Sequence, residues 1–266
     1  MRFFKMQNCG NDYIFIFEKP SKQLIKKLCN RNFGIGGDGV VYLYKKGERY
    51  GYEIYNRDAS KATFCGSVTL CLGFYLYKNY GVENMEILTD CGAKKVCVKR
   101  EEKSIKVGVE VGKPHFQAKI NNEKDRVFNR LLLLKDKGKT LRIRATLVNV
   151  GNLHLVIKGN YLKSIREKIV MAINKDQTFK AGVNVEFVNY KNDQIKTFVY
   201  ERGSGETLCC SSGACAVFAV LNKSRLVGDN AVINFRGGKL QLCLKSGKIW
   251  VFGQPKLVFE GEFDNI

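Results

Sequence analysis

The sequence predicts an α/β protein made of two similar halves, each a set of strands around one buried helix. Short segments that alternate apolar and polar residues recur along the chain, as in strands separated by turns. Two segments, 66–80 and 211–226, are apolar on nearly every side, and a helix of this kind is a buried one. Their surroundings repeat at an offset of about 145 residues, which indicates a duplicated domain.

The expected strands fall into two groups on either side of Gly112-Lys113-Pro114. This tripeptide interrupts the alternation, and glycine with proline commonly ends regular structure. It marks the expected boundary between an N-terminal domain, 1–113, and a C-terminal domain, 114–255. The expected strands are 2–6, 13–17, 40–44, 52–55, 85–89, 94–99, 104–111, 140–150, 155–157, 183–190, 197–200, 231–235, 239–244 and 248–252.

Four helices are expected between these strands. The two buried helices each begin after a cysteine that is followed by small residues. Gly81 and Gly228 fit their C-terminal ends, because glycine readily adopts the left-handed conformation that stops a helix. The expected helices are 21–31, 66–80, about 160–173 and 211–226.

The order and spacing of polar and thiol residues support the duplication. Three features recur in the same order, at offsets of 141 to 145 residues. Two related halves that face each other would place corresponding loops on opposite sides of a shared cleft. The matched features are Gly10-Asn11 with Gly151-Asn152, Asn56 with Glu201, and Cys65 with Cys210.

The composition favours a globular protein in a reducing compartment. Hydrophobic residues make up 45% of the chain, and the longest aliphatic run, 131–134, is far too short to cross a bilayer. Because the first residues hold no hydrophobic stretch of signal-peptide length, we expect a cytoplasmic protein that does not bind membranes. Its ten cysteines should then be mostly reduced thiols.

Charge and ligand patterns disfavour two other classes of protein. The formal charge of +20 favours anionic partners, but the lysines are dispersed, so nucleic-acid binding is not expected. No CxxC pair occurs and the only histidines are His115 and His154, which argues against a zinc site. No metal is expected.

Two thiols at matched places can carry out proton transfer at a carbon centre. One thiolate removes an α-proton while a neutral thiol on the opposite face supplies one, and the roles exchange in reverse. A helix N-terminus lowers the pKa of a cysteine and binds anions, so it can also hold a substrate carboxylate. Cys65 and Cys210 both precede expected helices, and His154 and Glu201 are the nearest candidates for tuning their protonation.

Other catalytic patterns fit less well. The segment 34–39 satisfies GxGxxG literally, but it follows a helix-like segment and precedes a strand, the reverse of a dinucleotide site. A pyridoxal enzyme would need a Schiff-base lysine, which the paired cysteines make unnecessary. We therefore expect no cofactor. Two buried structural thiols remain the simplest alternative reading of the cysteines.

The residues around both cysteines resemble the diaminopimelate epimerase family. The most specific segment is 201–214, ERGSGETLCCSSGA, which is similar to the family's ERGxGETxACGTGA. The resemblance runs over the whole chain. Further matching segments are 5–12, 34–39, 55–60, 65–66, 150–154 and 182–185.

The resemblance implies a fold of two pseudo-symmetric domains, each a curled mixed sheet around a central helix. In that fold the last strand returns to the first domain, so about 256–266 would complete it. By position, Cys65 and Cys210 become the two acid/base thiols, since Cys209 falls on the family's alanine. The implied substrate contacts are Asn11, Asn56, Asn152, Asn184, Glu201 and Arg202, with Gly66-Ser67 and Ser211-Ser212 at the carboxylate-binding helix starts.

Several departures from the family pattern leave the substrate open. The family's CGNG is here Cys65-Gly66-Ser67-Val68, which changes hydrogen bonding and backbone freedom beside the reacting carbon. Ala59 replaces a usual glycine and Leu153 a usual proline, and Gly39 stands where some members place glutamine.

The sequence therefore predicts a cofactor-independent amino-acid epimerase or racemase. This is an isomerase whose partner is a small-molecule amino-acid substrate. The family-default substrate is LL- or meso-diaminopimelate, an intermediate of lysine biosynthesis. A racemase of a different amino acid, such as histidine, is the alternative motivated by the altered Cys65 loop. A non-catalytic ligand-binding or nucleic-acid-binding relative is the alternative of another class. The oligomeric state stays open, with a homodimer as one option.

Overall fold

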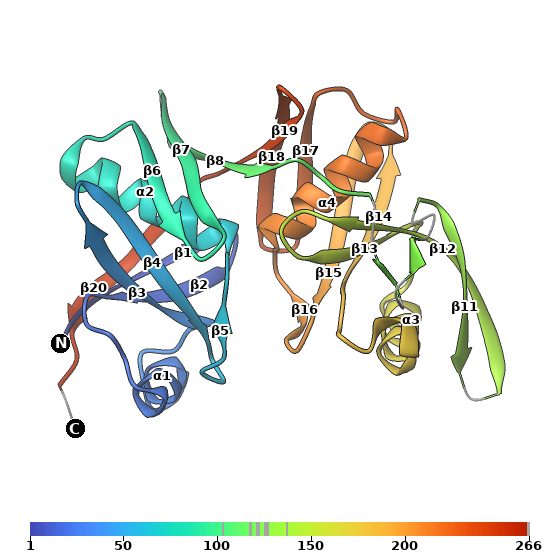
Figure 1. The fold of residues 1–266 in the computed structure, drawn as a ribbon, viewed down its shortest axis with the longest axis horizontal. Helices are drawn as coiled ribbons and strands as arrows, with labels where there is room; N and C mark the ends of the chain where they lie inside the picture. The colour runs from blue at the N-terminus through green and yellow to red at the C-terminus, as the bar shows by residue number, and fades with distance from the viewer. Residues whose placement is uncertain (103, 117–118, 121–122, 125–127, 137, 265–266) are drawn as a thin grey trace. The chain divides into compact units, whose positions relative to one another are not determined.

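A computed structural model describes residues 1–102, 104–116, 119–120, 123–124, 128–136 and 138–264. The chain divides into two compact units (Figure 1). One unit comprises residues 1–110 together with 251–266, and the other comprises residues 111–250. The C-terminal segment thus belongs to the same unit as the N-terminus.

The first unit is a curled mixed sheet around helix α2 (Gly66–Tyr80). Helix α1 (Lys22–Cys29) connects its parallel strands β2 and β3. The strands are β1 (Arg2–Asn8), β2 (Asn11–Ile16), β3 (Gly39–Lys46), β4 (Arg49–Asn56), β5 (Lys61–Ala62), β6 (Asn84–Thr89), β7 (Gly92–Glu101), β8 (Ser104–Gly112) and β20 (Lys256–Glu262).

The second unit is built in the same way around helix α4 (Ser211–Lys223). Helix α3 (Lys163–Lys175) and the short 3₁₀ helix Gln177–Phe179 connect its parallel strands β13 and β14. The strands are β9 (Lys119–Ile120), β10 (Glu123–Lys124), β11 (Arg130–Asp136), β12 (Lys139–Asn149), β13 (Leu153–Lys158), β14 (Asn184–Lys191), β15 (Gln194–Glu201), β16 (Gly205–Thr207), β17 (Asn230–Phe235), β18 (Gly238–Lys245) and β19 (Lys248–Gly253).

Strand pairing repeats in the same order and sense in both units. In the first, β20, β1 and β2 pair antiparallel, β2 pairs parallel with β3, and β3 pairs antiparallel with β4. In the second, β11, β12 and β13 pair antiparallel, β13 pairs parallel with β14, and β14 pairs antiparallel with β15. After each buried helix the chain adds a strand parallel to β4 or β15. The predicted fold class is confirmed: two pseudo-symmetric α/β units, each a curled mixed sheet around a central helix.

The two central helices are buried for the reason that the sequence gives. Most residues of α2 and α4 are buried, because apolar side chains occupy all sides of each helix. Gly81 ends α2 in the left-handed conformation (φ 69°), and its N–H donates to the Tyr77 carbonyl oxygen at 2.9 Å.

The expected end of α4 at Gly228 is wrong. The helix ends at Lys223, and Arg225 takes the left-handed conformation (φ 58°). The N–H of Leu226 then bonds to the Leu221 carbonyl oxygen at 3.0 Å, which closes the helix two residues before the glycine.

Strand β11 was missed in the sequence because its four consecutive leucines show no alternation. In the structure the alternation is present, since Leu132 and Leu134 are buried while Leu131 and Leu133 are about half exposed. Helices long and apolar enough to span a membrane are absent from the described part of the chain.

Candidate functional site

Cys65 and Cys210 occupy the same position in the two units, directly before a central helix. Cys65 is the N-cap of α2 with φ −141° and ψ 121°, and Cys210 is the N-cap of α4 with φ −137° and ψ 119°. The first backbone N–H groups of each helix therefore lie beside a cysteine side chain, where anions are favoured. Gly66, Ser67 and Ser211 are buried in these first turns, and Ser212 is partly exposed.

The Cys65 thiol is half-buried and lies against polar groups of strand β2. Its Sγ is 3.8 Å from Asn11 Oδ1 and 3.7 Å from the Tyr13 hydroxyl. The Tyr52 hydroxyl contacts the backbone N–H and carbonyl of Cys65, both at 3.4 Å. The sequence singled out Asn11, and the structure places it beside the first cysteine.

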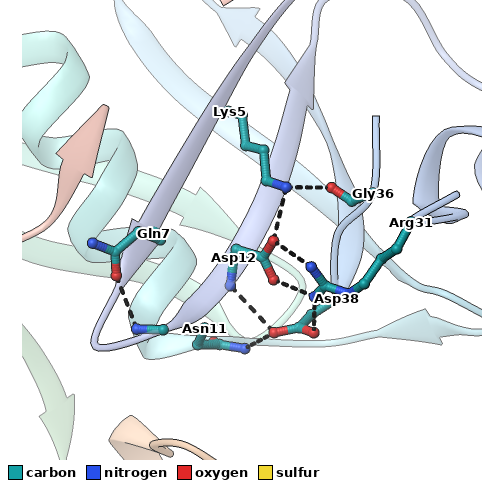
Figure 2. Close-up of polar contacts among 8 residues, drawn as sticks. Lys5, Gln7, Asn11, Asp12, Arg31, Gly36 and Asp38 are labelled. Atoms are coloured by element: carbon teal, nitrogen blue, oxygen red, sulfur yellow. Dashed lines mark hydrogen bonds and ion pairs between the residues drawn. The ribbon is translucent and has the colours of Figure 1, made fainter. Parts of the chain in front are cut away.

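A network of charged groups fixes the Asn11 side chain (Figure 2). Asn11 Nδ2 donates to Asp38 Oδ2 at 3.0 Å, so its amide oxygen is the atom left to face Cys65. Arg31 bonds Asp38 at 3.0 Å and holds both Asp12 carboxylate oxygens, at 2.7 and 3.1 Å. Lys5 pairs with Asp12 at 2.9 Å. The glycine-rich segment 34–39 thus supplies Asp38 to a structural network.

The two carboxylates of this network titrate differently. Burial alone would raise the pKa of Asp12, but hydrogen bonds and charge from Arg31 and Lys5 hold it below its ordinary value. Burial raises the pKa of Asp38, and the neighbouring Asp12 charge adds to this effect. Hydrogen bonds and charge from Asp12 and Asp38 raise the pKa of Arg31, so this side chain stays protonated.

Cys210 lies in a more enclosed and more acidic environment. Its Sγ is 3.3 Å from Ser212 Oγ and accepts from the Gly213 N–H at 3.4 Å. Burial raises the pKa of the Cys210 thiol well above its ordinary value, and the charges of Glu201 and Glu186 add to this effect. The expectation that the helix N-terminus lowers this pKa is therefore wrong for Cys210, because burial and two carboxylates outweigh the helix.

Glu201 ends strand β15 beside Cys210. Burial raises the pKa of Glu201, while hydrogen bonds from Thr207 (2.6 Å) and Cys210 partly offset the effect. Arg202, the next residue, donates its N–H to Asn184 Oδ1 at 2.9 Å. Asn184 in turn donates to the Leu153 carbonyl oxygen at 3.3 Å, so these predicted substrate contacts lie together in the second unit.

His154 is fully buried and lies between two side-chain oxygens. Its Nδ1 is 2.6 Å from Glu186 Oε1, and its Nε2 is 2.8 Å from Asn152 Oδ1. Glu186 is also fully buried, and among the described residues its Oε2 has no hydrogen-bond partner. Glu186 was not predicted from the sequence. A carboxylate between apolar residues of an expected buried strand is unusual, and this feature could have indicated a functional residue.

Asn56 lies at the end of β4, in the position that corresponds to Glu201. Its side-chain nitrogen donates to Ser60 Oγ at 2.9 Å and its N–H to the Ser60 carbonyl oxygen at 2.8 Å. In the second unit the strand-end residue Glu201 thus bonds with the cysteine, whereas in the first unit Asn56 bonds with Ser60 of its own turn. Groups of three or more residues able to hold a metal ion are absent from the described residues.

A known protein family matches this chain over most of its length. The family model described as diaminopimelate epimerase matches residues 3–117 and 146–258. The chain is 32% identical over 284 residues to the diaminopimelate epimerase of Methanococcus maripaludis (strain C5), covering 99% of this chain and 100% of the relative. It is 31% identical over 282 residues to the diaminopimelate epimerase of Leptospira biflexa serovar Patoc, covering 99% of each chain.

Solved structures with the same fold are more distant in sequence. A hydroxyproline epimerase from Agrobacterium vitis with bound trans-4-hydroxy-L-proline has a TM-score of 0.71 at 14% identity, covering 98% of this chain and 91% of that chain. A PhzF-family phenazine biosynthesis protein from Bacillus anthracis has a TM-score of 0.73 at 11% identity, covering 100% of this chain and 99% of that chain. These likenesses show the two-domain fold.

Proposed function

Because the chain belongs to the diaminopimelate epimerase family and is thus an isomerase, we propose that it inverts an amino-acid α-carbon with two thiols, Cys65 and Cys210. The observation that carries the proposal is the matched placement of the two cysteines. Both are N-caps of buried helices, and their backbone angles agree within a few degrees. This placement sets each thiol beside the first backbone N–H groups of a helix, where a substrate carboxylate can bind.

The mechanism assigns opposite proton states to the two thiols. Burial and two carboxylates keep Cys210 protonated, so it is suited to donate a proton to the α-carbon. Cys65 takes the complementary role, the thiolate that removes the α-proton. After one turnover the roles are exchanged, and the reverse reaction begins from that state. No cofactor takes part in these steps.

The substrate carboxylate would bind at the starts of α2 and α4. The N–H groups there stabilise the charge that flows into the carboxylate when the α-proton leaves. Asn11, Asn56, Asn152, Asn184 and Arg202 would contact the rest of the substrate. Diaminopimelate, the substrate in the names of the relatives, is the first candidate. Ser67 and Val68 at the Cys65 loop favour testing other amino acids, including histidine.

Deuterium incorporation tests the mechanism and the substrate together. The protein is incubated in deuterated water with LL-diaminopimelate, meso-diaminopimelate or single L-amino acids. A two-base reaction gives early product that carries deuterium at the α-carbon while the remaining substrate keeps its hydrogen. Deuterium entering both at equal rates would point to a single base instead, and no wash-in with any amino acid would reject the proposed activity.

Cysteine variants test the assignment of the two thiols. We expect Cys65→Ser and Cys210→Ser each to lower kcat/KM by about 10³-fold or more, because each removes one of two essential proton carriers. Cys91→Ser is the matched control, since Cys91 is exposed and is not among the residues assigned to proton transfer or substrate binding. Full activity in either site variant would refute the two-thiol mechanism.

A further inference from the structure

Tyr13 occupies in the first unit the place that His154 occupies in the second. Both are the third residue counted from a Gly-Asn turn's asparagine, on strands β2 and β13, and both lie in the parallel pairing with the next strand. Tyr13 pairs with Gly39, and His154 pairs with Asn184. Both rings are buried, with 7% and 0% exposure. The duplicated fold therefore buries one polar ring at the same place in each unit; Tyr13 contacts the Cys65 sulfur, and His154 contacts Glu186.

Gly39 gives the Tyr13 ring the room it needs. A Cβ at position 39 would lie 2.9 Å from Tyr13 Cε1 and 2.4 Å from the Tyr55 carbonyl oxygen. Such distances are shorter than any ordinary carbon contact. A side chain at this position is thus incompatible with the ring orientation that brings the Tyr13 hydroxyl to 3.7 Å from the Cys65 sulfur.

The Asn11 and Tyr13 side chains, which both contact the Cys65 sulfur, differ in the hydrogen bonds that they can form with it. Asn11 presents its amide oxygen, which only accepts hydrogen bonds, because its nitrogen is held by Asp38. That contact favours the protonated thiol. The Tyr13 hydroxyl can accept from the thiol and can also donate to a thiolate. Of Asn11 and Tyr13, only Tyr13 can form a hydrogen bond with Cys65 both as a thiol and as a thiolate.

We propose that Tyr13 is a positioning residue whose hydroxyl stabilises the Cys65 thiolate, in a space that Gly39 leaves open. The assignment rests on the proposed function for the role of the thiolate in turnover, although the contact itself does not. A phenol that donates in one state and accepts in the other costs no rearrangement when the proton moves.

Other titratable groups near Cys65 do not share this role. Tyr52, from β4, is fully buried and its hydroxyl contacts the Cys65 backbone and Thr69. Cys71, one turn and a half along α2, is fully buried, and burial raises its pKa well above the ordinary value. Two further thiols interact electrostatically with these groups: Cys91 with Tyr52, and Cys9 with Cys71. The Tyr13 hydroxyl, from strand β2, contacts the Cys65 sulfur itself.

The test measures alkylation of Cys65 by iodoacetamide as a function of pH, followed by peptide mass spectrometry. Only the thiolate reacts, so the midpoint reports its stability. We expect Tyr13→Phe to raise the Cys65 midpoint by about 1–2 pH units, the size of one hydrogen bond to a charged group. Tyr42→Phe, a hydroxyl removed from β3, is the control and should leave the midpoint unchanged.

A second variant separates donation from packing. Replacing Tyr13 by 4-aminophenylalanine keeps a donor at the ring position, and its midpoint should stay within about 0.3 pH unit of the parent. The proposal is overturned if Tyr13→Phe leaves the Cys65 midpoint unmoved, or if the amino variant shifts as far as the Phe variant. A midpoint shift without deuterium wash-in on any amino acid would uphold the contact and reject only the proposed function.

Discussion

Gly213, in the first turn of helix α4, packs closely against the carboxylate of Glu186. A Cβ at this position would be 2.8 Å from Glu186 Oε1 and 3.3 Å from Cys210 Cβ. The carboxylate cannot simply move away, because the same oxygen contacts His154 Nδ1 at 2.6 Å. Gly213→Ala therefore probes the fit of the buried His–Glu pair beside the second cysteine.

The size of the effect follows from these contacts. The new methyl group is about 0.5 Å too close to Oε1, and overpacking of this kind costs about 1–3 kcal/mol. Weakening the charge-assisted contact between Glu186 and His154 adds about 1 kcal/mol. The better helix propensity of alanine offsets about 1 kcal/mol. We expect Gly213→Ala to lower the free energy of unfolding by about 1–3 kcal/mol.

A double-mutant cycle with Glu186→Asp makes this prediction specific. The shorter side chain withdraws the carboxylate from the new methyl group, so the double variant should lose about 1 kcal/mol less than the two single variants together. The measurement is urea unfolding with unchanged m-values, supported by hydrogen exchange in α4. Costs that simply add, within about 0.5 kcal/mol, would refute a direct clash with Glu186.

Three further predictions follow from the titrating groups. Glu201→Gln removes one of the charges that raise the pKa of Cys210, so the pH midpoint of Cys210 alkylation should fall by about 1 unit; an unchanged midpoint would contradict this. Arg31→Ala should cost about 1 kcal/mol at pH 7, because it removes a partner that lowers the pKa of Asp12. That stability is present above the unfolded pKa and lost as pH falls through the folded pKa, so the difference between the proteins should begin to shrink in acid unfolding below about pH 4. Burial raises the pKa of Cys29 to about 11, so its stabilising effect is complete below the unfolded value and is lost as pH rises from about 9 to about 11; Cys29→Ala should flatten this part of the stability profile.

The repeat and both cysteines could be predicted from the sequence because they depend on local pattern. Apolar residues on all sides mark α2 and α4 as buried, and each cysteine precedes its helix directly. The offset of 145 residues that links Cys65 to Cys210 also links Gly39 to Asn184 and Asn56 to Glu201. One duplication therefore accounts for the fold and for the positions of the candidate residues.

The polar groups behind the cysteines could not be predicted, because they come from distant strands. Asp38 lies in a glycine-rich segment that resembles a nucleotide motif, and its role appears only where Asn11 and Arg31 converge on it. In the sequence Glu186 is a single charged residue in an apolar strand. Its contact with His154 of the neighbouring strand is known only from the structure. The effect of burial on the pKa of Cys210 also needs the packed structure, since the helix N-terminus alone predicts the opposite sign.

The duplication keeps the backbone at the two cysteines but changes the charge beneath them. The position of Glu186 in the second unit is Val41 in the first, and the position of Gly213 is Val68. Both valines are fully buried, so the first unit places apolar side chains where the second places a carboxylate and the glycine that makes room for it. An added negative charge favours the protonated form of a nearby thiol, and its replacement by a valine removes that bias. In the proposed mechanism this difference would make Cys210 the resting acid and Cys65 the resting base. Glu186 and Glu201 of the second unit, at the positions of Val41 and Asn56 in the first, would then set the direction in which the first proton moves.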